Sequence, residues 1–342
     1  MIWLLLPATA ALVTALLTGL LYRYAFRAGL IDRPNPRSSH TIPTARGGGL
    51  AIVATASAAL GLLCLLNILP VRLFAAAAGG GLAVAAVGFF DDRHALPARV
   101  RLAVHLCAAI WCLAWLGGLP PLLIGRQLIH LGWSGYLLGT LAIVWVLNLF
   151  NFMDGIDGIA ASEAIFVTCA GAVLGSPPAT PEVLAAAIVG AACMGFLVWN
   201  WPPAKIFMGD VGSGYLGFMI AVLALAATRS NPVSIWVWLI LGGTFFVDAT
   251  VTLVRRTLHG ERVHEAHRSH AYQWLARRWG RHLPVTLSVL ALNVLWLFPA
   301  AWLAVSYPSL AIWIVAAAYA PLILLAIAAG AGRPEQLVPD SP

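Results

Sequence analysis

Residues 141–170 read LAIVWVLNLFNFMDGIDGIAASEAIFVTCA, two apolar runs joined by a short segment that carries Asn, Asp and Gly. With their flanking residues, both runs approach the about 20 mostly apolar residues that a membrane-spanning helix requires. The joining segment 151–157 leaves almost no room for a loop. Asn148, Asn151, Asp154 and Asp157 recur at intervals of three, which predicts four oxygen-bearing side chains along one face of a helical turn. The stretch therefore predicts two spanning helices that meet at a polar site on the surface of a bilayer.

The rest of the chain is equally apolar. Of 342 residues, 61% are hydrophobic and 10% are charged, and the mean hydropathy is +0.88, whereas a soluble domain is about half apolar. The apolar segments lie at 2–22, 48–68, 73–90, 100–118, 134–150, 158–175, 182–200, 213–228, 233–254, 284–306 and 309–330. We expect an all-α integral membrane protein, a polytopic bundle of about 11 transmembrane helices. One membrane domain is expected over residues 1–330, followed by a short polar cytoplasmic tail over 331–342.

Basic residues predict the orientation of this bundle. All of the 20 Lys and Arg residues except Arg72, Arg126 and Arg229 lie in loops after odd-numbered segments or in the tail. The positive-inside rule places these loops in the cytoplasm and the N-terminus outside. No Lys or Arg precedes Arg23, so segment 2–22 is expected to be an uncleaved spanning helix. The expected environment is the lipid bilayer, no nucleic-acid partner is expected, and a homodimer is left open.

Two further acidic islands lie at the cytoplasmic ends of segments. Asp91 and Asp92 end segment 73–90. Neighbours on a helix point about 100° apart, so these two carboxylates can serve different tasks at one site, such as holding a metal and receiving a proton.

The third island is KIFMGDVGSG at 205–214. Its three glycines leave backbone N–H groups at the start of a helix, where a phosphate binds readily. Asp210 would repel a bare phosphate at this place, so it is predicted as a ligand of a metal ion. Carboxylate and amide oxygens are the ligands of Mg²⁺, and Phe207 is available to stack on a base.

The largest cytoplasmic loop, residues 255–283, contains His264, His267, Arg268 and His270. Three His at this spacing suit a zinc site, and an ordinary basic loop that faces lipid is a second interpretation. We favour a third, in which Arg and His contact phosphate and one His moves a proton.

In this order, the motifs resemble those of the polyprenyl-phosphate N-acetylhexosamine-1-phosphate transferases, the family that makes lipid I and initiates O-antigen. The resemblance covers about residues 30–280 and rests on the following segments: Thr44 to Gly49, Asp91-Asp92, Asn148 to Gly158, Asn200, Lys205 to Ser213, and the His loop. It implies a cytoplasmic active site in the bacterial cytoplasmic membrane.

The resemblance also implies a reaction. An oxygen of undecaprenyl phosphate attacks the sugar-linked phosphorus of a UDP-N-acetylhexosamine, UMP leaves, and synthesis of a cell-surface polysaccharide begins. A covalent intermediate and a direct displacement are both left open.

Residue roles follow from the resemblance. It implies that Asp210 binds Mg²⁺ with Asn151 beside it, with Mn²⁺ in its place left open. The residues assigned to catalysis are Asp91 and Asp92 near the lipid phosphate, Asp154, Asp157, His267 and His270. The residues assigned to substrate binding are Asn200 and Phe207 at the uridine, Arg46, Asn148, Lys205, Gly209, Ser213 and Arg268.

Two details bear on the sugar and on rival functions. The spacing of His267 and His270 resembles the O-antigen initiators more than the lipid I enzyme, so GlcNAc or FucNAc is expected rather than a muramyl peptide. A CDP-alcohol phosphotransferase would need an Arg where Ser162 stands. An ion-coupled transporter, the alternative from a different class, keeps its acids near the bilayer midplane, and here only Glu163 and Asp248 lie within spans.

Overall fold

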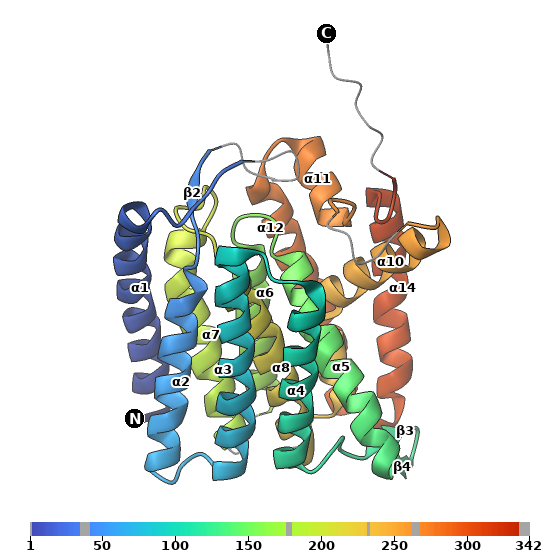
Figure 1. The fold of residues 1–342 in the computed structure, drawn as a ribbon. Helices are drawn as coiled ribbons and strands as arrows, with labels where there is room; N and C mark the ends of the chain where they lie inside the picture. Colours follow the sequence, from blue (N-terminus) through green and yellow to red (C-terminus); the bar gives the residue numbers. More distant parts are fainter. Residues whose placement is uncertain (1, 35–41, 176–179, 231–232, 262–266, 335–342) are drawn as a thin grey trace.

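The computed structural model describes residues 2–34, 42–175, 180–230, 233–261 and 267–334, and in these ranges it is a bundle of helices (Figure 1). The N-terminal half contains α1 Ile2–Ala28, β1 Ile31–Asp32, β2 Thr44–Ala45, α2 Gly49–Leu65, α3 Val71–His94, α4 Ala98–Leu116, β3 Leu122–Ile124, β4 Gln127–Ile129 and α5 Gly132–Met153. The C-terminal half contains α6 Ile159–Leu174, α7 Pro181–Asn200, α8 Asp210–Ser230, α9 Ile235–Leu241, α10 Gly243–Leu258, α11 Ala271–Trp279, α12 His282–Leu292, the π-helix η1 Asn293–Leu297, α13 Phe298–Ser306, the 3₁₀ helix η2 Pro308–Leu310 and α14 Ala311–Ala329.

The helices confirm a multi-pass membrane protein. Within the described ranges, eight helices are long and apolar enough to cross a bilayer, and a ninth span results if α9 and α10 are counted together. The helices α2 and α6 are apolar but have only 17 and 16 residues. The expected number of about eleven spans is therefore not confirmed, although each expected segment contains a helix.

The expected span over 233–254 contains two helices, α9 and α10, rather than one continuous helix. The chain bends by 77° between α9 and α10, at the pair Gly242 and Gly243, and α10 then runs obliquely across the bundle (Figure 1). A Cβ atom on Gly243 would lie 3.0 Å from the Tyr319 ring and 3.2 Å from Leu297, so the absence of a side chain at the bend fits its close packing. Hydropathy identifies the segment as apolar but carries no information on its direction.

Helix α8 is the centre of the bundle and is almost entirely buried. Its first turns touch the backbones of two other helices: a Cβ atom on Gly49 of α2 would clash with Gly212, and one on Gly88 of α3 would clash with the carbonyl of Asp210. Such contacts require glycine, because only glycine lets two backbones approach this closely. These contacts bring the α2 start and the α3 end against the N-terminus of α8.

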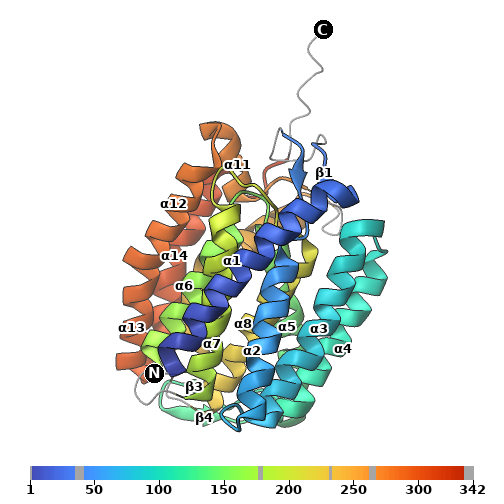
Figure 2. The same ribbon diagram turned by 90° about the vertical axis from the view of Figure 1, so that its left-hand side faces the viewer.

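The two ends of the bundle differ. The hairpin of β3 and β4 lies at the end that holds the N-terminus (Figures 1 and 2). At the other end lie β2, α11 and the C-terminal end of α14 (Figure 1). The expected tail begins as part of the packed structure, since Ala331 is buried and the Gly332 N–H donates to the Ser269 carbonyl. Residues 335–342 of the tail lie outside the described residues.

Candidate active site at the N-terminus of α8

Asp92 of α3 caps the N-terminus of α8. Its Oδ1 accepts a hydrogen bond from the Asp210 N–H at 2.9 Å and its Oδ2 accepts one from the Val211 N–H at 3.2 Å. Gly209 leaves the room for this carboxylate, because a Cβ atom there would meet Asp92 Oδ2 at 2.5 Å. These are the N–H groups that the glycine pattern predicts for a phosphate, so the seat at α8 holds a carboxylate of the protein itself.

Arg46, which follows β2, joins Asp92 to Asp210. Its Nη2 lies 2.7 Å from Asp92 Oδ1 and 2.9 Å from Asp210 Oδ1, and its Nη1 lies 3.7 Å from Asp32 of β1. Burial acts to lower the pKa of Arg46, but the nearby carboxylates, above all Asp92 and Asp210, hold that pKa above its ordinary value. The guanidinium is therefore the local counter-ion of at least two acids.

A second guanidinium and an amide complete this cluster. Arg101 of α4 lies 2.5 Å from Asp91 Oδ2 and 3.8 Å from Asp210 Oδ2, and the other Asp91 oxygen accepts from the Leu96 N–H. Asn151, near the end of α5, lies within hydrogen-bonding reach of the Asp210 carboxyl. We refer to Arg46, Asp91, Asp92, Arg101, Asn151 and Asp210 as the α8 cluster.

Asp154 faces this cluster from the end of α5. Burial, and next the charge of Asp210, raise the pKa of Asp154 well above its ordinary value. A carboxyl with a raised pKa beside other carboxylates is a common feature of catalytic sites, because such a group can take up or release a proton during a reaction.

The expectation that Asn148, Asn151, Asp154 and Asp157 share one helical face is wrong for Asp157. Helix α5 ends at Met153, and Gly158 takes a left-handed conformation with φ of +74°, so Asp157 lies beyond the helix. The Asn148 side-chain amide donates a hydrogen bond to the Val144 carbonyl, one turn earlier in α5, at 2.7 Å. The flanking glycines at 155 and 158 are the signal for this ending.

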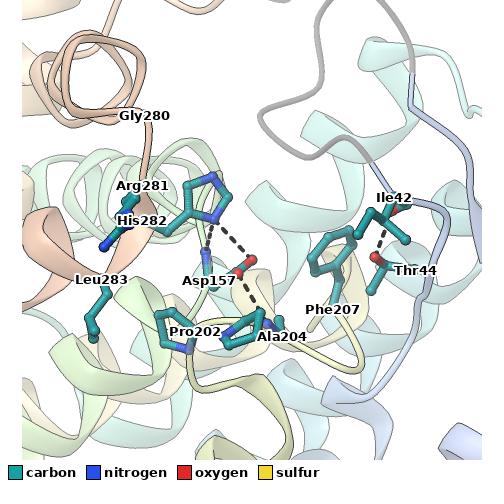
Figure 3. Close-up of a pocket in the computed structure, with 11 residues that line it drawn as sticks. Ile42, Thr44, Asp157, Pro202, Ala204, Phe207, Gly280, Arg281, His282 and Leu283 are labelled. Atoms are coloured by element: carbon teal, nitrogen blue, oxygen red, sulfur yellow. Dashed lines mark hydrogen bonds and ion pairs between the residues drawn. The ribbon is translucent and has the colours of Figure 1, made fainter.

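Asp157 instead lines a pocket of about 460 Å³ (Figure 3). Thr44 and Phe207, which line the same pocket, precede Arg46 and Asp210 in the chain by two and three residues. Asp157 Oδ2 accepts from the Ala204 N–H at 3.0 Å, and its Oδ1 lies 3.2 Å from His282 Nδ1. Figure 3 shows the half-buried Phe207 ring beside Thr44, across the pocket from His282 and Arg281. An aromatic face, a hydroxyl and basic side chains in one cavity suit a flat, polar, anionic ligand.

The histidine loop packs against the end of α5. His270 is 2% exposed, its ring lies 4.9 Å from that of His267, and the Tyr272 hydroxyl donates to the Phe152 carbonyl at 2.9 Å. Burial, and next the neighbouring His270, lower the pKa of His267 to about 3, so His267 is neutral at physiological pH. Arg268 offers its carbonyl to Arg277, and His264 lies outside the described residues, so the three-histidine zinc site stays untested.

Three residues that were predicted to contact substrate make contacts within the protein in this structure. Asn200 links two loops, since its Oδ1 accepts from the Gly158 N–H and its Nδ2 donates to the Ile206 carbonyl. Ser213 returns its hydroxyl to the Gly209 carbonyl. The exposed Lys205 places its Nζ 5.3 Å from the centre of the Trp199 ring.

Sequence reasoning assigned no site role to Arg101, Asp32, Arg281 or His282. Arg101 and Arg281 entered it only as markers of membrane orientation, because a guanidinium in a loop satisfies the positive-inside rule whatever else it contacts. The available signal for Arg101 is its position just inside a helix that directly follows the Asp91-Asp92 pair.

The chemistry of the α8 cluster fits a divalent metal ion. Within the described residues, no three His, Cys, Asp or Glu side chains are grouped as a ready metal site. Asp210, Asp92, Asp91 and Asn151 nevertheless supply carboxylate and amide oxygens, which are the donors that Mg²⁺ takes. In this structure Arg46 and Arg101 contact these oxygens.

Comparison with known proteins agrees with this geometry. Residues 73–228 match the model of glycosyl transferase family 4. A probable undecaprenyl-phosphate N-acetylglucosaminyl 1-phosphate transferase of Bacillus subtilis is 32% identical, over 77% of this chain and 74% of that protein. A decaprenyl-phosphate N-acetylglucosaminephosphotransferase of Mycobacterium tuberculosis is 30% identical, over 83% of this chain and 78% of that protein.

The chain belongs to this family of polyprenyl-phosphate sugar-1-phosphate transferases. A phospho-N-acetylmuramoyl-pentapeptide-transferase of Chlamydia muridarum is also similar, with 30% identity over 66% of this chain and 71% of that protein. The protein is thus a membrane-embedded transferase, and the transporter and CDP-alcohol phosphotransferase alternatives are set aside. The matched segment contains every residue of the α8 cluster except Arg46.

Proposed function

We propose that this transferase moves a sugar-1-phosphate from a UDP-N-acetylhexosamine to undecaprenyl phosphate at the cytoplasmic face of the bacterial inner membrane, releasing UMP. The single observation that carries the proposal is the α8 cluster, in which acids from α3 and α8 meet two guanidiniums beside a pocket. Two anionic substrates need such a mixture, because cations bind their phosphates and carboxylates hold the metal that balances the remaining charge. The names of the relatives support the substrate classes.

The pocket beside the cluster is proposed as the nucleotide site. Phe207 would stack on the base, and Arg281 and His282 at the start of α12 would face the phosphates or ribose (Figure 3). Asp157 would then act indirectly: it fixes the loop before α8 through the Ala204 N–H and orients His282. This is a positioning role rather than the catalytic one expected from the sequence.

Asp210 and Asn151 are proposed to hold Mg²⁺, with Mn²⁺ as a substitute. The metal supplies positive charge that stabilises the diphosphate as it cleaves. Among the chain's own residues, Arg46 and Arg101 would orient the two phosphates, and Asp154 would hold or accept a proton at the incoming lipid phosphate. In the transfer, the bond forms between a lipid-phosphate oxygen and the sugar-linked phosphorus, and the bond from that phosphorus to UMP breaks.

The sugar is proposed to be GlcNAc or FucNAc, with the product feeding an O-antigen-like polysaccharide. The test supplies purified protein with undecaprenyl phosphate, Mg²⁺ and a panel of UDP-sugars, and measures UMP together with the lipid product by mass spectrometry. UMP and a matching lipid-linked sugar diphosphate are expected with one N-acetylhexosamine. Absence of both with every UDP-N-acetylhexosamine would contradict the proposal, and turnover with the muramyl pentapeptide alone would overturn the sugar assignment.

A further inference from the structure

We propose that Arg46 is a built-in substitute for the metal: it neutralises Asp92 and Asp210 while the site is empty, and a divalent cation displaces it so that it can bind the donor diphosphate. The inference rests on the proposed function in one respect, the use of Asp210 as a metal ligand. It adds a competition between a side chain of the protein and the metal for the same oxygens.

The first argument is the position of the charge. One nitrogen of Arg46 lies within 2.9 Å of Asp210 Oδ1 and within 2.7 Å of Asp92 Oδ1, so these carboxylates share one guanidinium. Two carboxylates of different helices approach one another at a cost unless a cation lies between them. Because the glycine contacts of α8 hold both helices close together, a cation at this position stabilises the site while both carboxylates are ionised.

The second argument is that the side chain can move while its backbone stays. The Arg46 N–H donates to the Leu30 carbonyl, and the following Gly48 and Gly49 N–H groups donate to the Phe207 and Met208 carbonyls. The segment is thus pinned to the loop before α8. The Arg46 side chain is 34% exposed, compared with 8% for Asp92, so its guanidinium reaches the site from the open side.

The third argument is that a second position exists for the guanidinium. A cavity of about 330 Å³ borders both Arg46 and Asp92 and is also lined by Asp32, Phe89 and Arg93. Asp32 already lies 3.7 Å from Arg46 Nη1. A rotation of the side chain toward Asp32 would free the oxygens of Asp92 and Asp210 while keeping the guanidinium paired and near the incoming phosphates.

The test measures Mn²⁺ affinity by electron paramagnetic resonance on the full-length protein in detergent, with and without the UDP-sugar that supports turnover. R46M removes the competing charge, so without donor it is expected to bind Mn²⁺ about tenfold more tightly than the wild type, as befits a charged hydrogen bond. The UDP-sugar should raise Mn²⁺ affinity less in R46M than in the wild type, since the freed guanidinium no longer joins the donor.

Three variants keep the outcomes distinct. R101M is the matched control, because it removes the other guanidinium of the cluster, which lies 2.5 Å from Asp91 Oδ2 but 3.8 Å from Asp210 Oδ2. At this longer distance from Asp210, its loss is expected to change Mn²⁺ affinity less than threefold. R46K keeps the charge but lacks the forked guanidinium that bridges two carboxylates, so its Mn²⁺ affinity should lie between those of the wild type and R46M. R46K also replaces R46M in the test if R46M fails to fold.

D210N distinguishes failure of the metal assignment from failure of the proposed displacement of Arg46. Wild-type Mn²⁺ affinity in D210N would overturn the metal assignment of the proposed function. Loss of binding in D210N, together with unchanged or weaker binding in both R46M and R46K, would overturn the displacement by Arg46 and leave the proposed function standing.

Discussion

Asp92 and Asp248 perform the same local task at two places in the molecule. Asp92 of α3 caps α8 through two N–H groups, and Asp248 of α10 caps α11 through the N–H groups of Ala271 and Tyr272, at 2.8 and 3.0 Å. Their side chains are equally buried, with 8% and 9% exposed. In both cases a carboxylate from one helix satisfies the donors at the start of another and faces the positive end of its dipole.

The two sites differ in their other partners. Asp248 accepts a hydrogen bond from the Thr252 hydroxyl at 3.1 Å, and its carboxylate lies 3.6 Å from His270 Nδ1. Asp92 shares Arg46 with the second carboxylate Asp210. Capping a helix therefore explains the burial of either acid, whereas the extra acid and the guanidinium at Asp92 indicate a site built to handle charged ligands.

The largest expected effect is a difference in activity between variants of the two capping residues, Asp92 and Asp248. D92N and D248N each weaken a helix cap, so both should lower the free energy of unfolding by about 0.5–2 kcal/mol. Only D92N removes charge from the α8 cluster, and we expect it to lower kcat for UMP release at least about a hundredfold, against less than about tenfold for D248N. Thermal unfolding and initial rates on the same preparations check this. An equal loss of activity in both variants would remove the distinction.

Phe207 tests the pocket beside the α8 cluster. F207A should raise KM for the UDP-sugar about tenfold or more while kcat falls less, because base stacking on an aromatic ring contributes about 1–3 kcal/mol. F207W, which keeps an aromatic face, is the control and should restore most of the affinity. A fall in kcat with unchanged KM in F207A would place the nucleotide elsewhere.

The smallest effect concerns the histidine loop beside Asp248. The pKa of His267 is about 3 in the folded protein, below its ordinary value of 6.5. Between these values the unfolded chain binds more protons than the folded one, so the stability supported by neutral His267 is present above pH 6.5 and declines as the pH falls. The melting temperature should drop less between pH 7 and pH 5 in H267Q than in the wild type. An identical drop in both proteins would show that His267 titrates normally.

Much of this arrangement could be predicted from the sequence, for a physical reason. Three acids, Asp91, Asp154 and Asp210, each lie directly before or after an apolar run whose orientation in the bilayer is predicted from the basic residues. In a bundle, the ends of such runs that face the same side of the bilayer lie at one surface, so these acids are expected to lie together. Contacts made across the bundle could not be predicted. Arg46 and Asp210 are separated by 164 residues, and no local pattern indicates that one guanidinium serves two acids.

The errors also have identifiable causes. The helical spacing from Asn148 to Asp157 continues through a point where glycine ends the helix, so a pattern at intervals of three places Asp157 on a face that does not exist. The bend at Gly242 lies within a segment that hydropathy identifies as one span, and only the pair of glycines marks it. Hydropathy indicates whether a segment lies in the bilayer or in water, but not the direction in which it runs.

The central claim is that the acids at the N-terminus of α8 form the centre of a metal-dependent sugar-phosphate transfer. The most direct measurement is UMP release by the wild type and D210N, with and without Mg²⁺ and undecaprenyl phosphate. The account predicts release by the wild type only when both are present, restored by Mg²⁺ after chelation, and none above background from a folded D210N protein. Metal-independent release by the wild type, or full activity in D210N, would contradict it.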